Sequence, residues 1–280
     1  MMTMIQEEQL NVKHSCALFE LSESSYYDWK KRKSSKSQMR RVALCKVIRE
    51  IYETSHGIYG APKITEALKK RGHHVGLKLV QKLMKTLKFR SVVVKKFRPT
   101  HSTSDNIVRE NLVTTEPTGP RQVLSTDITY IWTKQDGWCY LSTIMDRYTK
   151  KILAWDLGKR MTEDLVIKTF NKVIAQQELP SEVILHSDQG SQYTSKAYEA
   201  LLKAHQVKHS FSRKGYPYHH ASLESWHGHL KREWIYQHDY QTFDEARKSI
   251  FWYIEAFYNQ RRIHQTLGYL SPDGFEKQIA

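Results

Sequence analysis

The feature that most constrains the fold is a change of hydrophobic pattern near residue 121. Before it, apolar residues repeat at helical spacing. After it, three successive runs, 123–132, 139–145 and 151–157, have the β-rich composition and alternation of strands. The Asp-Gly pair at 136–137 is a hairpin signal between the first two runs. The second half of the chain therefore begins with three neighbouring strands.

Helices and strands alternate through the rest of this half. We expect helices at 162–176 and 195–205 and strands at 183–186 and 207–211. Three strands followed by alternating helices and strands predict an α/β fold with a mixed sheet flanked by helices. A last helix is expected over 244–259. Before it, a core-facing helical stripe consists of Leu223, Trp226, Leu230 and Trp234.

The first half of the chain has the pattern of a small helical domain. We interpret 42–90 as a three-helix unit of the helix-turn-helix type, with its last helix over about 77–88. Two short helical patterns occupy 12–33. The predicted organisation is a short N-terminal helical segment with a basic linker (1–41), a helix-turn-helix-like DNA-binding domain (42–94), a linker (95–121) and a core with a C-terminal helical extension (122–280).

Positive charge is concentrated in the helical half. The formal net charge is +15, and residues 30–98 hold 21 Lys and Arg against three Glu. Such a one-signed block suits a polyanion such as double-stranded DNA, bound in a salt-sensitive way. Lys78, Lys82 and Lys85 on the predicted last helix are candidate DNA contacts. The alternative is an ordinary helical bundle whose lysines only keep it in solution.

Cysteine usage and hydropathy exclude several protein classes. Cys16, Cys45 and Cys139 are scattered without a C-x-x-C pair, which argues against a disulfide framework and against a thiolate zinc site. No apolar run approaches the roughly 20 residues that span a bilayer, and the first residues lack an apolar signal segment. We therefore expect a cytoplasmic protein without membrane association.

Three carboxylates mark the candidate chemistry of the sheet half. Asp127 is centred in the first strand pattern, Asp188 follows the strand at 183–186, and Glu224 lies on the helix with the apolar stripe. If they converge at one edge of the sheet, they supply the hard oxygen ligands that Mg²⁺ or Mn²⁺ prefers for two-metal phosphoryl transfer. Each acid alone also has a structural interpretation, as a sheet-edge cap, the start of a turn or an exposed helical glutamate.

Five sequence strings occur in an order that resembles a known family. They are STDITYIW, YLSTIMDRYTKKILAW, HSDQGSQYTS, SFSRKGYPYHHASLESWHGHLKRE and YNQRRIHQTLGYLSP. Together they closely resemble the integrase-core transposases of the insertion-sequence three (IS-three) family, specifically the product of its downstream reading frame. The segment 42–90 is similar to the helix-turn-helix that precedes that family's core. The match covers nearly the whole chain from residue 42.

The resemblance implies a ribonuclease H-like fold and a catalytic triad of two aspartates and one glutamate. Carried over by motif, the triad is Asp127 in TDITY, Asp188 in HSDQG and Glu224 in LESW, and it would hold two Mg²⁺ or Mn²⁺ ions. The 35 residues between Asp188 and Glu224 match the family spacing. Lys231, two turns after Glu224, resembles the family's lysine on the catalytic helix, which would contact phosphate.

Other polar residues near these motifs have less specific interpretations. Asp146 is expected to be structural, because the family pattern gives it no catalytic place. His219 and His220 stand where family members commonly have Asp-Asn; with His227 and His229 they suggest a histidine-rich zinc site as an alternative to polar contacts with DNA or loops. Further candidate phosphate contacts are Arg213, Lys214, Arg261, Arg262 and His264.

The resemblance implies a DNA transposase that hydrolyses a phosphodiester at the element's end and transfers the freed 3′-hydroxyl to a second phosphodiester. Two other functions stay open: a DNA-binding regulator with a vestigial core, and a ribonuclease H-like nuclease. The expected partners are transposon-end and target DNA, further copies of this chain on that DNA and the upstream-frame protein. When bound to DNA, the protein would be associated with the bacterial nucleoid.

Overall fold

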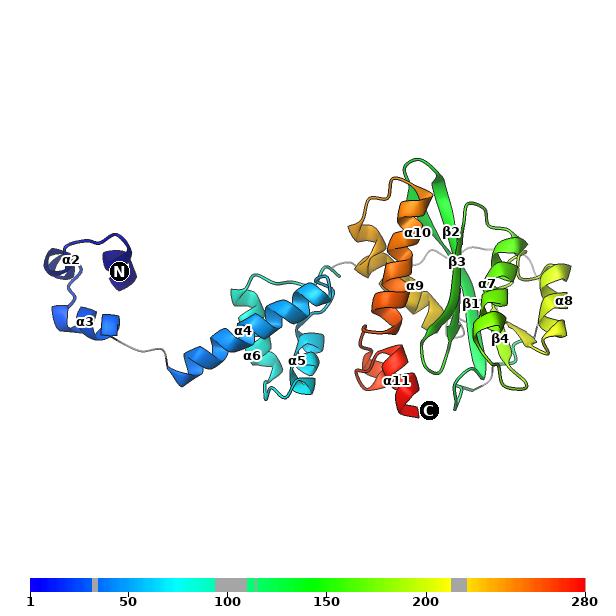
Figure 1. Cartoon of the computed structure of the whole chain (residues 1–280), viewed down its shortest axis with the longest axis horizontal. Helices are drawn as coiled ribbons and strands as arrows, with labels where there is room; N and C mark the ends of the chain where they lie inside the picture. Colours follow the sequence, from blue (N-terminus) through cyan, green and yellow to red (C-terminus); the bar gives the residue numbers. More distant parts are fainter. Residues whose placement is uncertain (32–34, 94–109, 114, 213–220, 280) are drawn as a thin grey trace.

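A computed structural model describes residues 1–31, 35–93, 110–113, 115–212 and 221–279. Helices make up the N-terminal half of the molecule, and the strands lie in the C-terminal half (Figure 1). This division confirms the change of pattern near residue 121.

A five-stranded sheet of order β3-β2-β1-β4-β5 forms the centre of the C-terminal half. Its first three strands pair antiparallel as a meander, whereas β4 runs parallel to β1 and β5 parallel to β4. This is the mixed sheet that the sequence predicts. The strands are β1 (Val123–Thr133), β2 (Gly137–Asp146), β3 (Ile152–Gly158), β4 (Ile184–Ser187) and β5 (Lys208–Phe211).

Helices cover both faces of the sheet (Figure 1). On one face, α7 (Glu163–Gln176) and α8 (Lys196–Ala204) enclose a core around Phe170. On the other, α9 (Ala221–Glu233) and α10 (Phe243–Phe251) bury a second core with the sheet. The predicted apolar stripe lies in that second core, since Leu223, Trp226, Leu230 and Trp234 are all buried.

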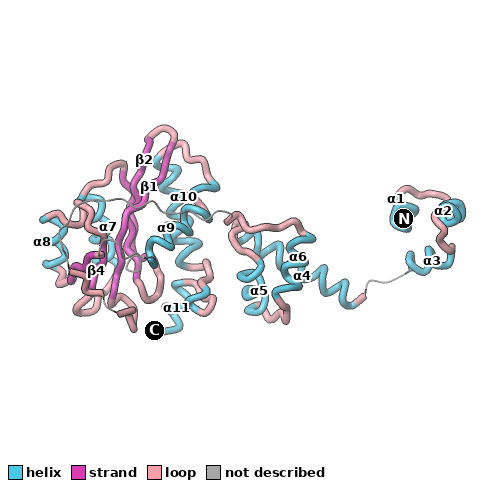
Figure 2. The backbone as a smooth tube through the Cα atoms, turned by 180° about the vertical axis from the view of Figure 1, so that it is seen from behind, coloured by secondary structure: helices cyan, strands magenta, loops and turns pink. Residues whose placement is uncertain are grey.

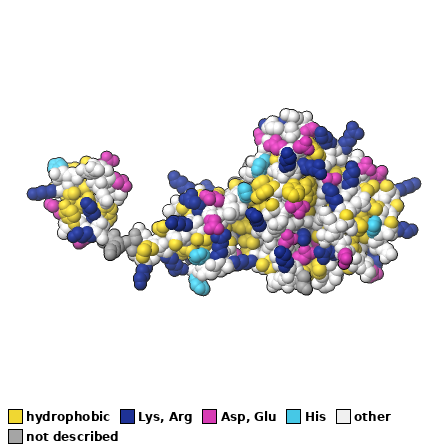
Figure 3. All heavy atoms as spheres, in the orientation of Figure 1, with side chains coloured by type: hydrophobic (Ala, Val, Ile, Leu, Met, Phe, Trp, Pro, Cys, Tyr) yellow, Lys and Arg dark blue, Asp and Glu magenta, His cyan; other side chains and the backbone are white. Residues whose placement is uncertain are grey.

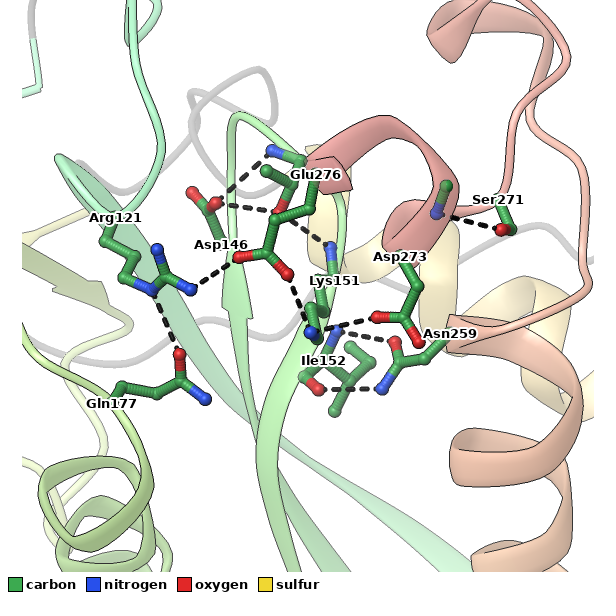
Figure 4. Close-up of polar contacts among 11 residues, drawn as sticks. Arg121, Asp146, Lys151, Ile152, Gln177, Asn259, Ser271, Asp273 and Glu276 are labelled. Carbon is green, nitrogen blue, oxygen red and sulfur yellow. Dashed lines mark hydrogen bonds and ion pairs between the residues drawn. The ribbon is translucent and has the colours of Figure 1, made fainter. Parts of the chain in front are cut away.

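Hydrogen bonds and ion pairs join the C-terminal segment to β3 and to residues next to it. Helix α10 continues as the π-helix η3 (Trp252–Asn259), whose Asn259 side chain hydrogen-bonds both the backbone N–H and the carbonyl of Ile152. Helix α11 (Pro272–Ile279), absent from the sequence prediction, places Glu276 between Arg121 and Lys151 (Figure 4). These ties hold α11 against the sheet.

The helical half contains the expected three-helix unit. Helices α4 (Lys36–Thr54), α5 (Ala61–Lys70) and α6 (Leu77–Thr86) pack around a buried centre. Helix α4 starts inside the segment expected to be a linker, because the Ser35 hydroxyl accepts a hydrogen bond from the Gln38 N–H and caps it. Among the described helices, none is both long and apolar enough to cross a bilayer.

The three-helix unit packs directly on the C-terminal segment (Figure 2). The Tyr59 hydroxyl donates to the carbonyl of Arg261 and accepts from the N–H of Ile263, both at 3.0 Å. The His56 ring packs edge-on against Trp234 and Trp252. The two halves therefore share one hydrophobic core. Helices α1 (Met2–Glu7), α2 (Val12–Leu18) and α3 (Glu23–Lys31) form a separate small core of their own.

Candidate active site

Asp127, within β1, and Asp188, just after the neighbouring strand β4, lie at the same level of the sheet. The parallel register of β1 and β4 pairs Ser125 with His186, and each aspartate stands two residues beyond its member of that pair. The buried Tyr193 ring lies close to both carboxylates: burial raises the pKa of its hydroxyl, and the negative charges of Asp127 and Asp188 raise it further. The first two members of the predicted triad are thus brought together.

A histidine on α9 orients the Asp127 carboxylate. Asp127 Oδ1 accepts a hydrogen bond from the N–H of Ile128 at 2.8 Å, and His227 Nδ1 lies 3.3 Å from Oδ2. On the other side of the ring, His227 Nε2 is 3.1 Å from Thr143 Oγ1, and Thr143 stands opposite Asp127 on β2. The imidazole therefore links the carboxylate to the neighbouring strand.

The sequence identifies His227 only by its helical spacing from Glu224. Its contact with Asp127 does not follow from that spacing, because the three residues Asp127, Thr143 and His227 come from three separate elements. The signal in the sequence is weak: a histidine three positions after the triad glutamate in a helix with an apolar stripe.

Glu224 lies in the first turn of α9, the helix that carries His227. Its side chain is exposed, and it shares a face with His227 at i+3 and Lys231 at i+7. Burial lowers the pKa of the Lys231 ammonium, and the nearby Asp127 carboxylate opposes this shift. The face of α9 that bears Glu224 is therefore the face turned toward Asp127.

The turn after β4 fixes the direction of the Asp188 side chain. Asp188 Oδ1 accepts a hydrogen bond from the N–H of Gly190 at 2.9 Å. A Cβ atom on Gly190 would lie 3.0 Å from the same oxygen and would overlap the Gln192 amide. A side chain at position 190 would thus displace the carboxylate, which gives the glycine of HSDQG a physical role.

The donor set fits a hard divalent cation in its chemistry. Carboxylate oxygens are the ligands that Mg²⁺ and Mn²⁺ prefer, and two of them share one sheet edge. Within the described part of the chain, however, no three His, Cys, Asp or Glu side chains gather closely enough to surround an ion. Glu224 shares its face of α9 with His227, but the three described carboxylates do not form such a group.

The histidine-rich alternative has no common centre among the described residues. His227 is directed to Asp127, whereas His229 Nδ1 lies 3.5 Å from Glu233 Oε1. His219 and His220 lie outside the described residues.

Asp146 is structural, as expected. Its carboxylate is fully buried at the end of β2, where it accepts from the Thr149 hydroxyl at 2.7 Å and from the N–H of Tyr148 at 3.0 Å. It closes the turn between β2 and β3, and Figure 4 shows it beside the contacts of Glu276.

The candidate DNA contacts fall into three groups. The side chains of Lys78, Lys82 and Lys85 are exposed on α6, and Lys and Arg side chains project from the α4–α6 unit in Figure 3. Arg261 is exposed as well. Arg213 and Lys214 lie outside the described residues.

Arg262 requires a correction. Its guanidinium is 3% exposed and makes two hydrogen bonds to Glu233, at 2.7 and 2.6 Å. Glu233 is equally buried, and it also accepts from the Tyr253 hydroxyl. The arginine therefore neutralises an interior carboxylate and is not presented to a phosphate. The sequence does not reveal this, since the partner lies on a different helix. The side chain of His264 packs beside Arg262, part-buried as well.

Comparisons with known proteins match both halves of the chain. An integrase core domain model matches residues 117–217, a second integrase core model matches 205–272, and an HTH-like domain model matches 39–97. The chain is 36% identical to the insertion element IS600 31 kDa protein of Shigella sonnei, over 94% of this chain and 97% of that protein. It is 31% identical to the transposase InsF of insertion sequence IS3A from Escherichia coli K12, over 97% and 96% of the two chains.

The chain belongs to the IS3 family of insertion-sequence transposases. This IS3-family transposase has an integrase core whose sheet order and flanking helices are ribonuclease H-like, as the sequence resemblance implied. It is a DNA transposase of the DDE type, a polynucleotidyl transferase. Among solved structures, it is similar to the HTLV-2 integrase catalytic core domain, with 16% identity, a TM-score of 0.43 and coverage of 55% of this chain and 94% of that one.

Proposed function

We propose that Asp127, Asp188 and Glu224 are the catalytic carboxylates of this transposase. The observation that carries the proposal is the in-register placement of Asp127 within β1 and Asp188 just after the adjacent parallel strand β4, with the Glu224 face of α9 turned toward Asp127 through His227. Asp188 follows the carboxyl end of the parallel strand β4, a position where open α/β sheets commonly bind ligands.

These carboxylates would hold Mg²⁺ or Mn²⁺, two ions in the active complex. The ions would stabilise charge on the attacking and leaving oxygens of an in-line displacement. Asp127 and Asp188 supply ligands from a rigid sheet edge, and Glu224 joins them from α9 when DNA is bound. His227 holds the Asp127 carboxylate in place throughout.

The reaction consists of two phosphodiester exchanges. In the first, a water oxygen bonds to the phosphorus at the element's end, and the bond to the 3′-oxygen breaks and leaves a 3′-hydroxyl. In the second, that hydroxyl bonds to another phosphorus and displaces its 3′-oxygen. Each exchange breaks one P–O bond and forms one, so neither needs an external energy source. No Ser or Tyr nucleophile of the protein is required.

DNA would be held by the basic residues of both halves. The exposed lysines Lys78, Lys82 and Lys85 place positive charge along one side of α6, as a recognition helix does. Lys231 and Arg261 extend that charge to the core. The complex would contain more than one copy of the chain, together with the upstream-frame protein, on nucleoid DNA. The bacterial insertion-sequence relatives support this setting.

The test compares Asp188→Ala and Glu224→Ala with the unaltered chain. The substrate is the end of the element, with Mg²⁺ present. We expect both variants to lose cleavage and joining while they retain DNA affinity, because neither carboxylate contributes to binding charge. Full activity in either variant would overturn the assignment.

Two product measurements separate the alternatives. A vestigial core would give no Mg²⁺-dependent nicks even in the unaltered chain. A ribonuclease H-like nuclease would cut hybrids and would give no joined DNA.

A further inference from the structure

The β1–β2 hairpin carries a group of exposed aromatic rings beside the candidate active site. Tyr130, Trp132 and Trp138 are 55%, 53% and 50% exposed, and they alternate along the strands with the buried Ile131 and Cys139. They therefore share the outer face of the hairpin. A contiguous exposed aromatic group of this kind marks an interaction site, because folding alone gains nothing from leaving such rings in water.

The rings are organised by contact with one another. Trp132 stands directly opposite Trp138 in the strand register, with ring centroids 5.1 Å apart in an edge-to-face arrangement. Tyr130 packs edge-on against the same Trp138 ring at 5.2 Å. Edge-to-face packing holds the rings in defined orientations without covering all of their flat faces. Stacking surface is thus left available.

These rings border a pocket of about 350 Å³ that also involves the end of α9. Tyr236, in the 3₁₀ turn η2 (Ile235–Gln237) after α9, lines the pocket and is 61% exposed. The pocket is within the size range of about 300–1,000 Å³ that is usual for small-ligand sites. Lys134, Asp239 and Lys231 line it too. Lys134 is ion-paired with Asp239 at 3.0 Å, so Lys231 supplies the positive charge beside the apolar wall.

Lys231 links the pocket to the candidate active site. The Lys231 ammonium lies 4.3 Å from the centroid of the Tyr130 ring, and Lys231 is two turns after Glu224 on α9. Tyr130 is three residues after Asp127 on β1, so the two side chains lie on opposite faces of the sheet. Lys231 therefore contacts the aromatic patch and also interacts with the charge of Asp127, from the helix that carries Glu224.

We propose that this hairpin aromatic patch, formed by Tyr130, Trp132, Trp138 and Tyr236, binds an unpaired DNA base next to the phosphodiester that is cut. The inference rests on the proposed function in placing the cut at Asp127. Flat ring faces beside a lysine match one nucleotide: the base stacks on the rings and the ammonium meets its phosphate. Neighbouring bases cover both faces of a base inside a duplex, and pairing holds it there, so the patch favours DNA whose end has opened.

A second copy of the chain is the other occupant considered for the patch. Lys231 disfavours it, because two copies joined through this face would bring their Lys231 ammonium groups toward each other. The positive charge of Lys231 is complementary to DNA phosphate and not to a second copy of the same surface.

The experiment measures DNA affinity without divalent metal, using the full chain. The probes are a fluorescein-labelled blunt duplex and the same duplex with a two-nucleotide unpaired 3′ end. The variant is Trp132→Ala with Trp138→Ala, and binding is followed by anisotropy. We expect the unaltered chain to prefer the unpaired end and the double variant to lose that preference. Its affinity for that probe should fall about 5- to 100-fold, with little change for the blunt duplex.

Matched controls separate stacking from folding. Phe251→Ala removes an equally exposed ring, 57% exposed, on α10 and outside the patch, and should leave both affinities unchanged. Trp132→Phe with Trp138→Phe should retain most of the preference, because phenyl rings still stack. An equal loss with Phe251→Ala, or unchanged preference in the double alanine variant, would overturn the proposal. So would a change of oligomeric state in sedimentation with the preference intact.

Failure of the proposed function gives a different result. The Asp188→Ala variant should keep the preference for the unpaired end, since binding is measured without metal. If Asp188→Ala still cut DNA, the triad assignment would fail while the binding result for the patch would stand by itself.

Discussion

His227 connects the Asp127 carboxylate of the candidate active site to the neighbouring strand. One ring nitrogen faces the Asp127 carboxylate and the other faces the Thr143 hydroxyl, so the ring position is fixed from both sides. Groups that orient a metal-binding carboxylate commonly change metal affinity about 10- to 100-fold when they are removed. This residue acts through Asp127 and is a positioning residue.

We therefore predict that His227→Ala raises the Mg²⁺ concentration needed for half-maximal cleavage by about 10- to 100-fold. The rate at saturating Mg²⁺ should fall much less, because the three carboxylates remain. A metal titration of cleavage measures both quantities. Ser225→Ala, an exposed position on the same helix, is the control.

His227→Asn, which can still donate a hydrogen bond, should restore part of the metal affinity. A loss of rate at every Mg²⁺ concentration, without a shift of the midpoint, would contradict a positioning role and would indicate a folding defect instead.

At the scale of elements, the strands and most helices follow from the sequence because each has a clear hydrophobic period. The three strands of the meander, the α9 stripe and the three-helix unit are all confirmed. The start of α4 does not follow, because Lys36–Arg41 has no apolar period; the Ser35 cap, not burial, begins the helix. Helix α11 is held by Glu276 through ion pairs with residues far along the chain, and sequence periodicity does not reveal such pairs.

The site was predictable to a similar extent and for related reasons. Motif spacing predicts the three acids, and the strand pattern places Asp127 within a strand and Asp188 just past a strand of the same sheet, as the structure has them. The distance of Glu224 from the aspartates, the contacts of His227 and the burial of Arg262 depend on how α9 packs on the sheet. No local signal encodes that packing.

Two histidines near Arg262, His229 on α9 and His264 in the C-terminal segment, give a prediction for the pH dependence of stability. Burial, together with the charge of Arg262, lowers the pKa of His229 to about 4 and that of His264 to about 2. Lys63 adds to the effect on both, Arg232 lowers the pKa of His229 further, and Glu233 only partly opposes it. The folded chain therefore takes up these protons less readily than the unfolded chain. Folding stability should decrease as the pH falls below the ordinary histidine pKa of 6.5.

Urea unfolding at pH 7.5 and pH 5.0 measures this effect. We expect the free energy of unfolding to fall by about 1–2 kcal/mol for His264 over this interval. His229, which is 37% exposed, should contribute less. The pKa of Glu233 is lowered to about 2, because Arg262 outweighs the effect of burial, so this carboxyl adds no pH dependence above pH 5.

The His264→Gln variant should show a smaller loss between the two pH values, whatever its stability at pH 7.5. A pH dependence equal to that of the unaltered chain would contradict the role of His264.

At the scale of the whole molecule, the two halves are one packed body with an uneven charge distribution. Tyr59 and His56 join the three-helix unit to the C-terminal segment, so DNA bound on α6 would be held at a defined position relative to the sheet edge. A rigid connection lets sequence-independent phosphate contacts on one half align the cut on the other. The positive charge of residues 30–98 would then help to position the DNA as well as raise the affinity for it.

This arrangement predicts the salt dependence of DNA binding. Replacing Lys78, Lys82 and Lys85 with Ala should reduce the slope of log affinity against log salt by about 0.9 for each phosphate that is no longer neutralised, roughly 3 in total. Anisotropy titrations with a fixed duplex at several KCl concentrations give the slope. Lys168→Ala with Lys203→Ala removes exposed lysines from α7 and α8, on the other side of the sheet from α9, and should change it little. If both sets of substitutions reduce the slope equally for each lysine removed, then α6 is no special DNA contact and the positive charge acts only as a diffuse field.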